Sequence, residues 1–288
     1  MNIGASTGAA IAPLIVIPIA VAYGWRVPFF VNGFIGVGWV LICFFWFRNH
    51  PSEMEDIPGE EKQFIERNRR FTDHKQPFPW KAALRNRSLL ALLLAYYCCQ
   101  WVNYFFIAWM PVYLQEGRHF SENDMKMAVS YLFIIGVIGA LSAGGVSDWL
   151  VKRKGAGFGR RFVAIFSFAM LGGLIFLAAI TTNNTIVIAS LIVAHLFYAP
   201  TAITSFSTCV DIGGDHAATV AGIMNCFGQL GAFFMAIIFG KIVDVTHNFA
   251  TPLVILSGVS LAGCLFWLLI DAGKPLVAES TANMSHGS

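Results

Sequence analysis

Charged side chains are scarce in this sequence, and long parts of it have none. Of the 288 residues, 12% are charged and 57% are hydrophobic, whereas about 25% of a soluble domain is charged. Seven windows lack Asp, Glu, Lys and Arg, and each has about 20 residues or more, enough for a helix to cross roughly 30 Å of hydrocarbon. The windows are Val27–Phe47, Leu89–Gln115, Met127–Ser147, Phe162–Thr185, Ile186–Val210, Ala217–Gly240 and Phe249–Ile270. This composition predicts an all-α, polytopic membrane protein that spans a lipid bilayer.

Patterns for metal, nucleic-acid and catalytic sites are also absent. The six cysteines have no metal-ligand spacing, and no basic patch contains the interleaved aromatic residues that favour nucleic acid. An intramembrane enzyme needs a set such as Ser with His, paired Asp or several His, but His195 is the single histidine within a window. His195 itself is open to two interpretations, a proton relay or a structural side chain. We therefore predict no metal, no cofactor, no nucleic-acid partner and no enzymatic activity.

The opening stretch "MNIGASTGAAIAPLIVIPIAVAYGWRVPFF" begins directly on apolar residues. No Lys or Arg precedes Arg26, so the positively charged start of a signal peptide is missing. A second apolar window follows "YGWRVP" at once, which is typical of a helical hairpin in a bilayer. With this stretch, the sequence predicts eight transmembrane helices.

Basic residues are divided unequally between the two sides of the predicted membrane region. If each window crosses once, one side holds nine Lys and Arg in segment 48–88, five in segment 150–161, and Lys274. The other side holds Arg26, Arg118, Lys126 and Lys241. Basic loops stay in the cytoplasm, so we expect a plasma (inner) membrane protein with a cytoplasmic C-terminus. Within segment 48–88, "PGEEKQFIERNRRF" predicts either a short helix that starts near Pro58 or a solvated linker.

The two ends of the apolar region resemble each other. "MNIGASTGA" (Met1–Ala9) and "MNCFGQLGA" (Met224–Ala232) share Met, Asn, Gly and Ala in register. The hairpins that follow also correspond, with Pro28 opposite Pro252, and each proline is expected in the first turn of its helix. Transporters often contain such internal repeats, and this one pairs the first two helices with the last two.

The repeat predicts the domain organisation. Six helices follow the long loop, so a matching first half would also have six, of which two are present. We expect residues 1–47 to be the last two helices of an N-terminal half, 48–88 a central cytoplasmic loop, 89–272 a complete six-helix half, and 273–288 a disordered cytoplasmic tail. The expected parent has twelve helices, and its first four are absent here. A gene fragment, a wrong start site and a real truncation all remain open.

Several motifs connect this architecture with a known family. "GALSAGGVSDWLVKRKGAGFGRR" (Gly139–Arg161) has Gly144 and Asp148 in a Gly-x-x-x-Asp pattern before a basic turn, and "NYFFIAWMPVYL" (Asn103–Leu114), "GWRVPFF" and "GIMNCFGQLGAFFMAIIFGKIVD" accompany it. With these motifs the sequence resembles the major facilitator superfamily and, within it, the anion:cation symporter family, which carries organic anions such as hexuronates, aldonates and aromatic acids. The resemblance implies a monomeric secondary transporter that moves a small organic anion together with protons or sodium by alternating access.

The resemblance also implies a gate. In the family, the signature Asp is thought to face the positive N-terminal end of a helix from the other half, which holds the cytoplasmic side shut. The residues assigned to this gate are Gly144, Asp148, Lys152 and Arg153. We expect Asp148 to lie near the start of the first helix, at Met1–Ala5; a plain basic loop is the alternative.

Polar side chains inside the windows supply the candidate substrate site, because polar groups in a membrane bundle need a partner. Three sets share a helical face or lie one turn apart: Gln100, Asn103 and Tyr104; Thr201, Ser205 and Thr208; Asn225 and Gln229. Such neutral donors can bind hydroxyls and a carboxylate without the desolvation cost of a bare charge. Interhelical hydrogen bonding is the alternative role for all three sets.

Acidic residues are missing from mid-membrane positions. In the family, the charged residues that couple protons and bind the substrate carboxylate lie mostly on the first four helices. A transport-inactive remnant or a receptor-like protein is therefore the alternative to a transporter.

Overall fold

A computed structural model describes residues 8, 15–16, 18–48, 53–54, 58–68 and 77–273. These residues form helices and the turns between them, and none of them lies in a strand. The chain divides into two compact units, one of Thr7–Gln76 and the other of Met1–Ser6 with Pro77–Ser288.

The smaller unit contains α2 (Val27–Trp46) and α3 (Gly59–Asn68). Pro28 lies in the first turn of α2, as predicted, and its carbonyl accepts a hydrogen bond of 2.9 Å from the Asn32 amide. The short helix predicted near Pro58 is confirmed, because α3 begins one residue later. Its first turn carries two glutamates, whose charge suits the positive end of a helix.

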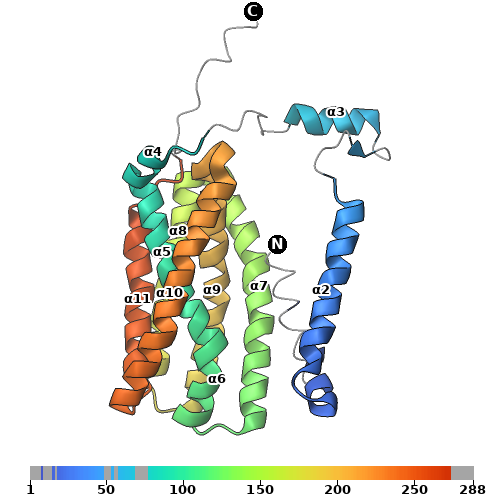
Figure 1. Cartoon of the computed structure of the whole chain (residues 1–288). Coiled ribbons are helices and arrows are strands. Elements are labelled where there is room, and N and C mark those ends of the chain that lie inside the picture. The colour runs from blue at the N-terminus through green and yellow to red at the C-terminus, as the bar shows by residue number, and fades with distance from the viewer. Residues whose placement is uncertain are drawn as a thin grey trace, which may run out of the picture. The chain divides into compact units, whose positions relative to one another are not determined.

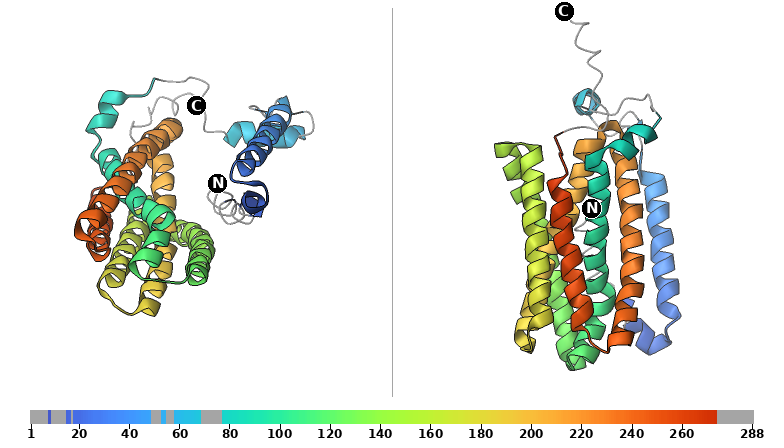
Figure 2. Two further views of the ribbon diagram at one scale, coloured as in Figure 1. Left: turned by 60° about the horizontal axis from the view of Figure 1, so that its bottom comes forward. Right: turned by 90° about the vertical axis from the view of Figure 1, so that its left-hand side faces the viewer.

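The larger unit is a bundle of long helices, which Figures 1 and 2 show side by side. After the short α4 (Trp80–Arg85), the elements are α5 (Arg87–Tyr104), η2 (Phe105–Trp109), α6 (Met110–Val112), η3 (Tyr113–Gly117), α7 (Glu122–Lys154), α8 (Ala156–Ile180), α9 (Asn184–Gly213), η4 (Gly214–His216), α10 (Ala217–Thr246) and α11 (Ala250–Leu268). Of these, α11 packs against α8 and α5, α9 against α7 and α8, and α10 against α5 and α9.

Side-chain caps start three of these helices. Asn86 accepts from the Leu89 N–H before α5, Ser121 from the Asp124 N–H before α7, and Asn183 from the Thr185 and Ile186 N–H groups before α9. Such caps satisfy backbone donors that have no partner in the first helical turn.

Glycines with positive φ end two of the helices. Gly155 (φ 83°) is the single residue between α7 and α8, and Gly214 (φ 52°) ends α9. Only glycine takes this conformation without steric cost, so the sequence sets both sharp turns.

Six helical stretches of the described residues are long and apolar enough to cross a membrane. One of them, Asn184–Thr246, has 63 residues. A straight helix of that length would measure about 95 Å, but the turn η4 divides the stretch into α9 and α10, each of 30 residues. The predicted count of eight is not confirmed, since most of the first predicted helix lies outside the described residues.

The helix that begins at Arg87 changes its winding after Tyr104. In η2 and η3 it is π-helical, with the Met110 N–H donating to the Phe105 carbonyl, and Pro111 lies between the two π turns. Proline lacks the N–H that continues an α-helix, and π turns in α-helices often occur at functional sites. Phe105 and Phe106 fill the bundle core at this point.

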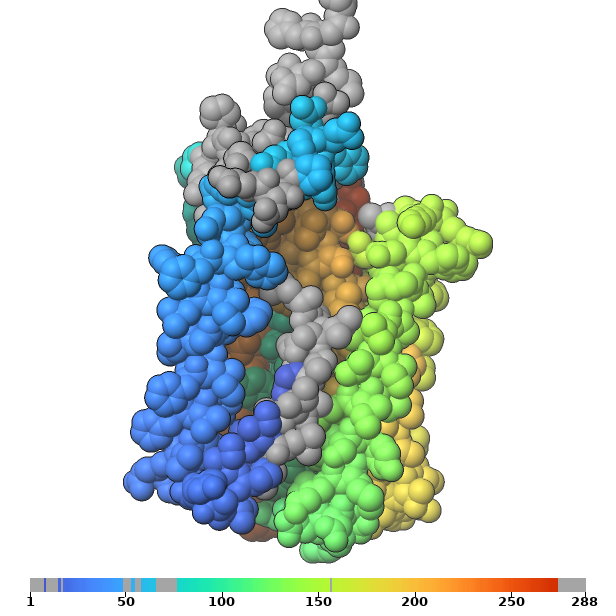
Figure 3. Space-filling model, turned by 90° about the vertical axis from the view of Figure 1, so that its right-hand side faces the viewer, coloured from blue at the N-terminus to red at the C-terminus, as the bar shows by residue number. Residues whose placement is uncertain are grey.

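Close helix contacts depend on glycine, as expected for helices packed in a membrane. Gly139 of α7 lies against the Leu196 carbonyl of α9, and a Cβ atom at Gly231 of α10 would be 2.6 Å from the Tyr97 carbonyl oxygen of α5. By contrast, α7 is the least buried long helix of this bundle. It carries a row of exposed apolar side chains that includes Tyr131, Ile134 and Ile138, and Figure 3 shows α7 in green with side chains visible along its length.

Candidate functional site

Gln100 lies at the centre of a small polar group between α5 and α9. Its Oε1 atom accepts from Asn103 Nδ2 and from the Tyr198 hydroxyl, each at 3.5 Å. Both distances are at the long limit for a hydrogen bond, and Gln100 Nε2 has no partner among the described residues. Asn103 and Tyr104 are half-buried beside it. The group therefore has hydrogen-bonding capacity that its own contacts do not use.

Asn225 and Gln229 are exposed on α10, one turn apart, and neither side chain hydrogen-bonds to a described residue. Gly228, which lies between them in the chain, packs against α5, and a Cβ there would be 2.8 Å from Gln100 Cγ. The contact brings the α5 and α10 polar residues to the same level of the bundle. Unpaired amides are costly against lipid, so this side of α10 is suited to a cavity or to protein.

The third predicted set lies inside the bundle. Thr201, Ser205 and Thr208 are fully buried. Thr201 Oγ1 donates to the Tyr198 carbonyl at 2.7 Å, and Ser205 Oγ donates to the Thr201 carbonyl at the same distance. Thr208 Oγ1 is buried without a partner among the described residues. The structure thus packs Gln100, which Asn103 hydrogen-bonds, against α10, but it keeps Ser205 and Thr208 in the core.

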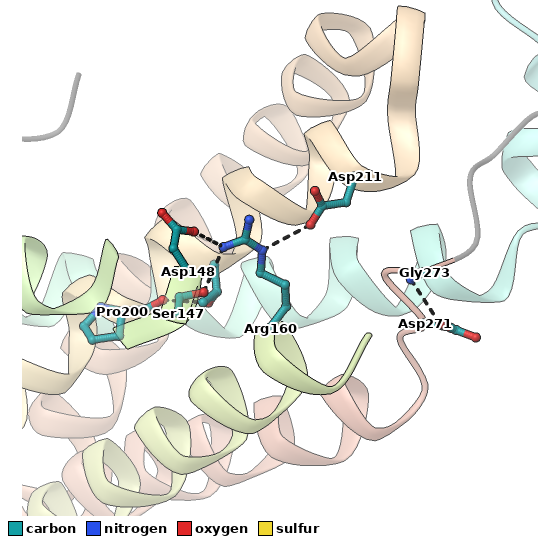
Figure 4. A network of polar contacts seen from close by, with 8 residues as sticks. Ser147, Asp148, Arg160, Pro200, Asp211, Asp271 and Gly273 are labelled. Atoms are coloured by element: carbon teal, nitrogen blue, oxygen red, sulfur yellow. Dashed lines mark hydrogen bonds and ion pairs between the residues drawn. The ribbon is translucent and has the colours of Figure 1, made fainter. Parts of the chain in front are cut away.

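Asp148 belongs to an ion-pair network that joins three helices (Figure 4). Arg160 of α8 lies 3.1 Å from Asp148 of α7 through Nη1 and 3.1 Å from Asp211 of α9 through Nε, and Nη1 also donates to Ser147 Oγ at 2.8 Å. The Arg160 side chain is 12% exposed, against 65% for Asp148 and 24% for Asp211. Two carboxylates therefore neutralise a largely buried guanidinium at the start of α8. We name Asp148, Arg160 and Asp211 the arginine clasp.

The other predicted gate residues lie outside the arginine clasp. Lys152 and Arg153 are exposed in the last turn of α7, where cations suit the negative end of the helix. The Arg153 guanidinium lies over the Trp149 ring at 4.3 Å. A Cβ at Gly144 would meet no atom within 4 Å. The predicted contact of Asp148 with residues 1–5 lies outside the described residues.

Sequence reasoning missed three contributors, namely Tyr198, Arg160 and Asp211. Arg160 was counted only as a basic loop residue, and Asp211 follows an uncharged window by one position. The neighbouring Arg161 donates through Nε to the Ile270 carbonyl at 3.0 Å, so the pair of arginines fixes the start of α8 to α7, α9 and the end of α11. The adjacent Arg160 and Arg161 at the edge of an apolar window were the available signal.

His195 is tightly packed. Its ring makes edge contact with Phe106 at 4.9 Å and stacks on Tyr198 at 5.6 Å. A Cβ at Gly136 of α7 would lie 2.7 Å from the His195 ring, so glycine is required opposite it. Nδ1 has no partner among the described residues. This dense aromatic setting favours the structural interpretation of His195. Among the same residues, no three His, Cys, Asp or Glu side chains are grouped to hold a metal ion.

Comparisons with known proteins agree on one family. The family model described as Major Facilitator Superfamily matches residues 1–236. The Probable sulfoacetate transporter SauU of Cupriavidus necator is 28% identical over 93% of this chain and 62% of its own length. The Hexuronate transporter of Bacillus subtilis is 28% identical over 96% and 65%, and the Probable L-galactonate transporter of Escherichia coli is 27% identical over 93% and 60%. The chain thus spans less than two thirds of the length of these curated relatives.

Proposed function

Because the chain belongs to the major facilitator superfamily, we propose that residues 77–273 form the substrate-facing bundle of a secondary transporter for small organic anions such as sugar acids. The similar proteins are named as transporters of sulfoacetate, hexuronate and L-galactonate. All three names describe carriers, not enzymes.

The observation that carries this proposal is the pair of unpaired amides on α10. Asn225 and Gln229 are exposed within a helix whose other exposed side chains include Leu230, Phe233 and Phe234. An amide N–H can donate to a carboxylate, and its carbonyl oxygen can accept from a hydroxyl. A sugar acid presents both groups, so the two amides fit it without a buried charge in this bundle.

The α5 residues complete the proposed contact surface. Gln100 and Asn103 are joined by a long hydrogen bond. A ligand can replace this bond at low cost, because each of the two side chains then forms a hydrogen bond to the ligand instead. Tyr104 lies beside them and supplies a hydroxyl. Contact of the substrate with Ser205 and Thr208 stays a prediction, and it requires α9 to move, since both hydroxyls are now fully buried.

The transport cycle that we propose is alternating access, with Asp148 and its neighbours Gly144, Lys152 and Arg153 at the gate. The arginine clasp favours this assignment, because it joins α7 to α8 and α9 at the end of the bundle that carries the basic residues. Cotransport with protons or sodium, an inner-membrane location, a cytoplasmic C-terminus and a monomeric state are parts of the same proposal.

Uptake of a labelled sugar acid by the full-length protein in proteoliposomes tests the proposal. Asn225→Ala and Gln229→Ala should each raise KM roughly 3- to 10-fold, which corresponds to one lost hydrogen bond of about 0.5–1.5 kcal/mol. Asn184→Ala and Gln115→Ala are matched controls, because these amides are exposed at helix ends away from the site. Unchanged KM in both site variants would reject the assignment, and binding without uptake would favour the receptor-like alternative.

A further inference from the structure

A cavity of about 310 Å³ lies at the end of the bundle opposite the arginine clasp. It is lined by Tyr113, by Glu116–His119 at the end of η3, and by His247–Ala250 in the turn between α10 and α11. We name this space the terminal pocket. Its volume falls at the small end of the range for ligand sites, about 300–1,000 Å³. The proposed substrate residues Asn225 and Gln229 do not line it.

Arg118 gives the terminal pocket a cation that is held in place. Its Nε donates to the Tyr113 hydroxyl at 2.8 Å, and its Nη2 donates to the carbonyls of Thr181 at 2.7 Å and Ala178 at 3.2 Å. These carbonyls end α8, so the arginine caps that helix. Nη1 has no partner among the described residues. A guanidinium fixed through two nitrogens with the third unused is a ready donor to an anion.

Two histidines form the opposite parts of the wall. His119 has φ 56° and His247 has φ 50°, and they are the two non-glycine residues with positive φ among those described. Histidine is one of the non-glycine residues that adopt this left-handed conformation more often than most. Both imidazoles are exposed, and neither makes a side-chain hydrogen bond to a described residue.

The fixed charges of the terminal pocket are Arg118 and Glu116, which cancel formally, and α11 contributes only Ala250 to the lining. An anion in the pocket would therefore have the unused Nη1 of Arg118 as its cationic partner.

We propose that the terminal pocket binds a small organic carboxylate, with the carboxylate between Arg118 Nη1 and the two imidazoles and the carbon skeleton against Phe249. A divalent metal fits less well, since no three His, Cys, Asp or Glu side chains of the described residues are grouped for metal binding. This site is separate from the proposed α10 site and does not depend on it.

Imidazole NMR signals of the full-length protein in lipid nanodiscs test this inference, with D-glucuronate as the probe. Signals of His119 and His247 are assigned by their loss in H119N and H247N. Asparagine tolerates the left-handed backbone, so these variants remove the imidazole with little strain. D-glucuronate should shift both signals, and uncharged glucose should not.

Matched variants separate this site from the proposed substrate site. His216→Asn removes an imidazole at the other end of the bundle and should leave the glucuronate response unchanged. Unmoved imidazole signals, equal shifts with glucose, or loss of the shifts in Asn225→Ala would each overturn the proposal. The NMR readout does not involve uptake. The terminal-pocket proposal can therefore fail while the Asn225 and Gln229 prediction holds, and that prediction can fail while the terminal-pocket proposal holds.

Discussion

The bundle of the larger unit contains a partly buried arginine at each end, but the partners of the two side chains differ. At the start of α8, Arg160 pairs with the carboxylates of Asp148 and Asp211. At the end of α8, Arg118 donates to two backbone carbonyls and to the Tyr113 hydroxyl. Carbonyls at a helix C-terminus carry only a partial negative charge. They accept hydrogen bonds from Arg118 Nη2 without neutralising the positive charge of the guanidinium.

This difference suggests different roles for the two ends. A neutralised guanidinium links helices and attracts little else, whereas an incompletely neutralised one can attract an anion from solution. The arginine clasp is therefore suited to hold α7, α8 and α9 together, and the terminal pocket is suited to binding. Substitutions at the clasp should mainly change stability, and substitutions at Arg118 should change both stability and anion binding.

The largest effect is expected for Arg160→Met. The substitution keeps the volume of the side chain but leaves Asp148 and Asp211 without their partner, and Asp211 is the less exposed of the two. Loss of hydrogen bonds to a charged group should lower the free energy of unfolding by about 2–3 kcal/mol. Thermal unfolding in detergent measures the change. Arg153→Met is the matched control, since Arg153 is exposed outside the clasp, and an equal loss in both variants would contradict the clasp.

A smaller effect is expected for Arg118→Met. Removal of the carbonyl cap should lower the free energy of unfolding by about 1–2 kcal/mol and abolish the glucuronate-induced imidazole shifts. Arg118→Lys should retain part of the anion response, because it keeps the charge, but not the fork of donors. Lys126→Met removes another cation near the same end, one that pairs with Glu122 at 2.6 Å. If it reduced the glucuronate response as strongly, general surface charge rather than Arg118 would explain the binding.

The smallest effects are expected for two glycines, one near each end. A Cβ at Gly117 would lie 2.8 Å from the Phe249 ring, so Gly117→Ala should cost up to about 1 kcal/mol as the ring shifts. At Gly144 a Cβ meets nothing within 4 Å, so Gly144→Ala should stabilise α7 by about 0.5–1 kcal/mol. Unfolding of the purified variants measures both changes. Destabilisation by Gly144→Ala would contradict this expectation.

Much of the helical framework could be predicted from the sequence, because its signals are local. Charge-free windows located the long helices, Pro28 and Pro58 located two helix starts, and the i, i+3, i+4 spacing grouped the polar residues. The same spacing could not show which neighbour covers a face. Thr201, Ser205 and Thr208 share a face as predicted, yet α9 turns that face into the bundle. There backbone carbonyls of α9 accept from Thr201 and Ser205, and the Thr208 hydroxyl has no partner among the described residues.

The arginine clasp and the terminal pocket could not be predicted, because both depend on contacts between distant segments. A single glycine between α7 and α8 folds Arg160 back toward Asp148, and Asp211 joins from a position 51 residues further along the chain. The pocket unites the end of η3 with a turn that comes about 130 residues later. Charge counting placed Arg118 on the less basic side, but it gave no sign of the carbonyls that hold it.

The π-helical winding of η2 and η3 has a consequence for how this part of the chain tolerates insertions and deletions. A π turn contains one more residue between bonded groups than an α turn. Deleting one residue from Phe105–Trp109 would therefore convert η2 to ordinary α-helix without interrupting the helix. Everything beyond the deletion would keep nearly the same facing and height, because the residue removed is the extra one that the π turn accommodates. Single-residue gaps in this stretch of related sequences would thus leave Arg118 on the same side relative to Gln100, and the change would be confined to the winding next to Phe105 and Phe106.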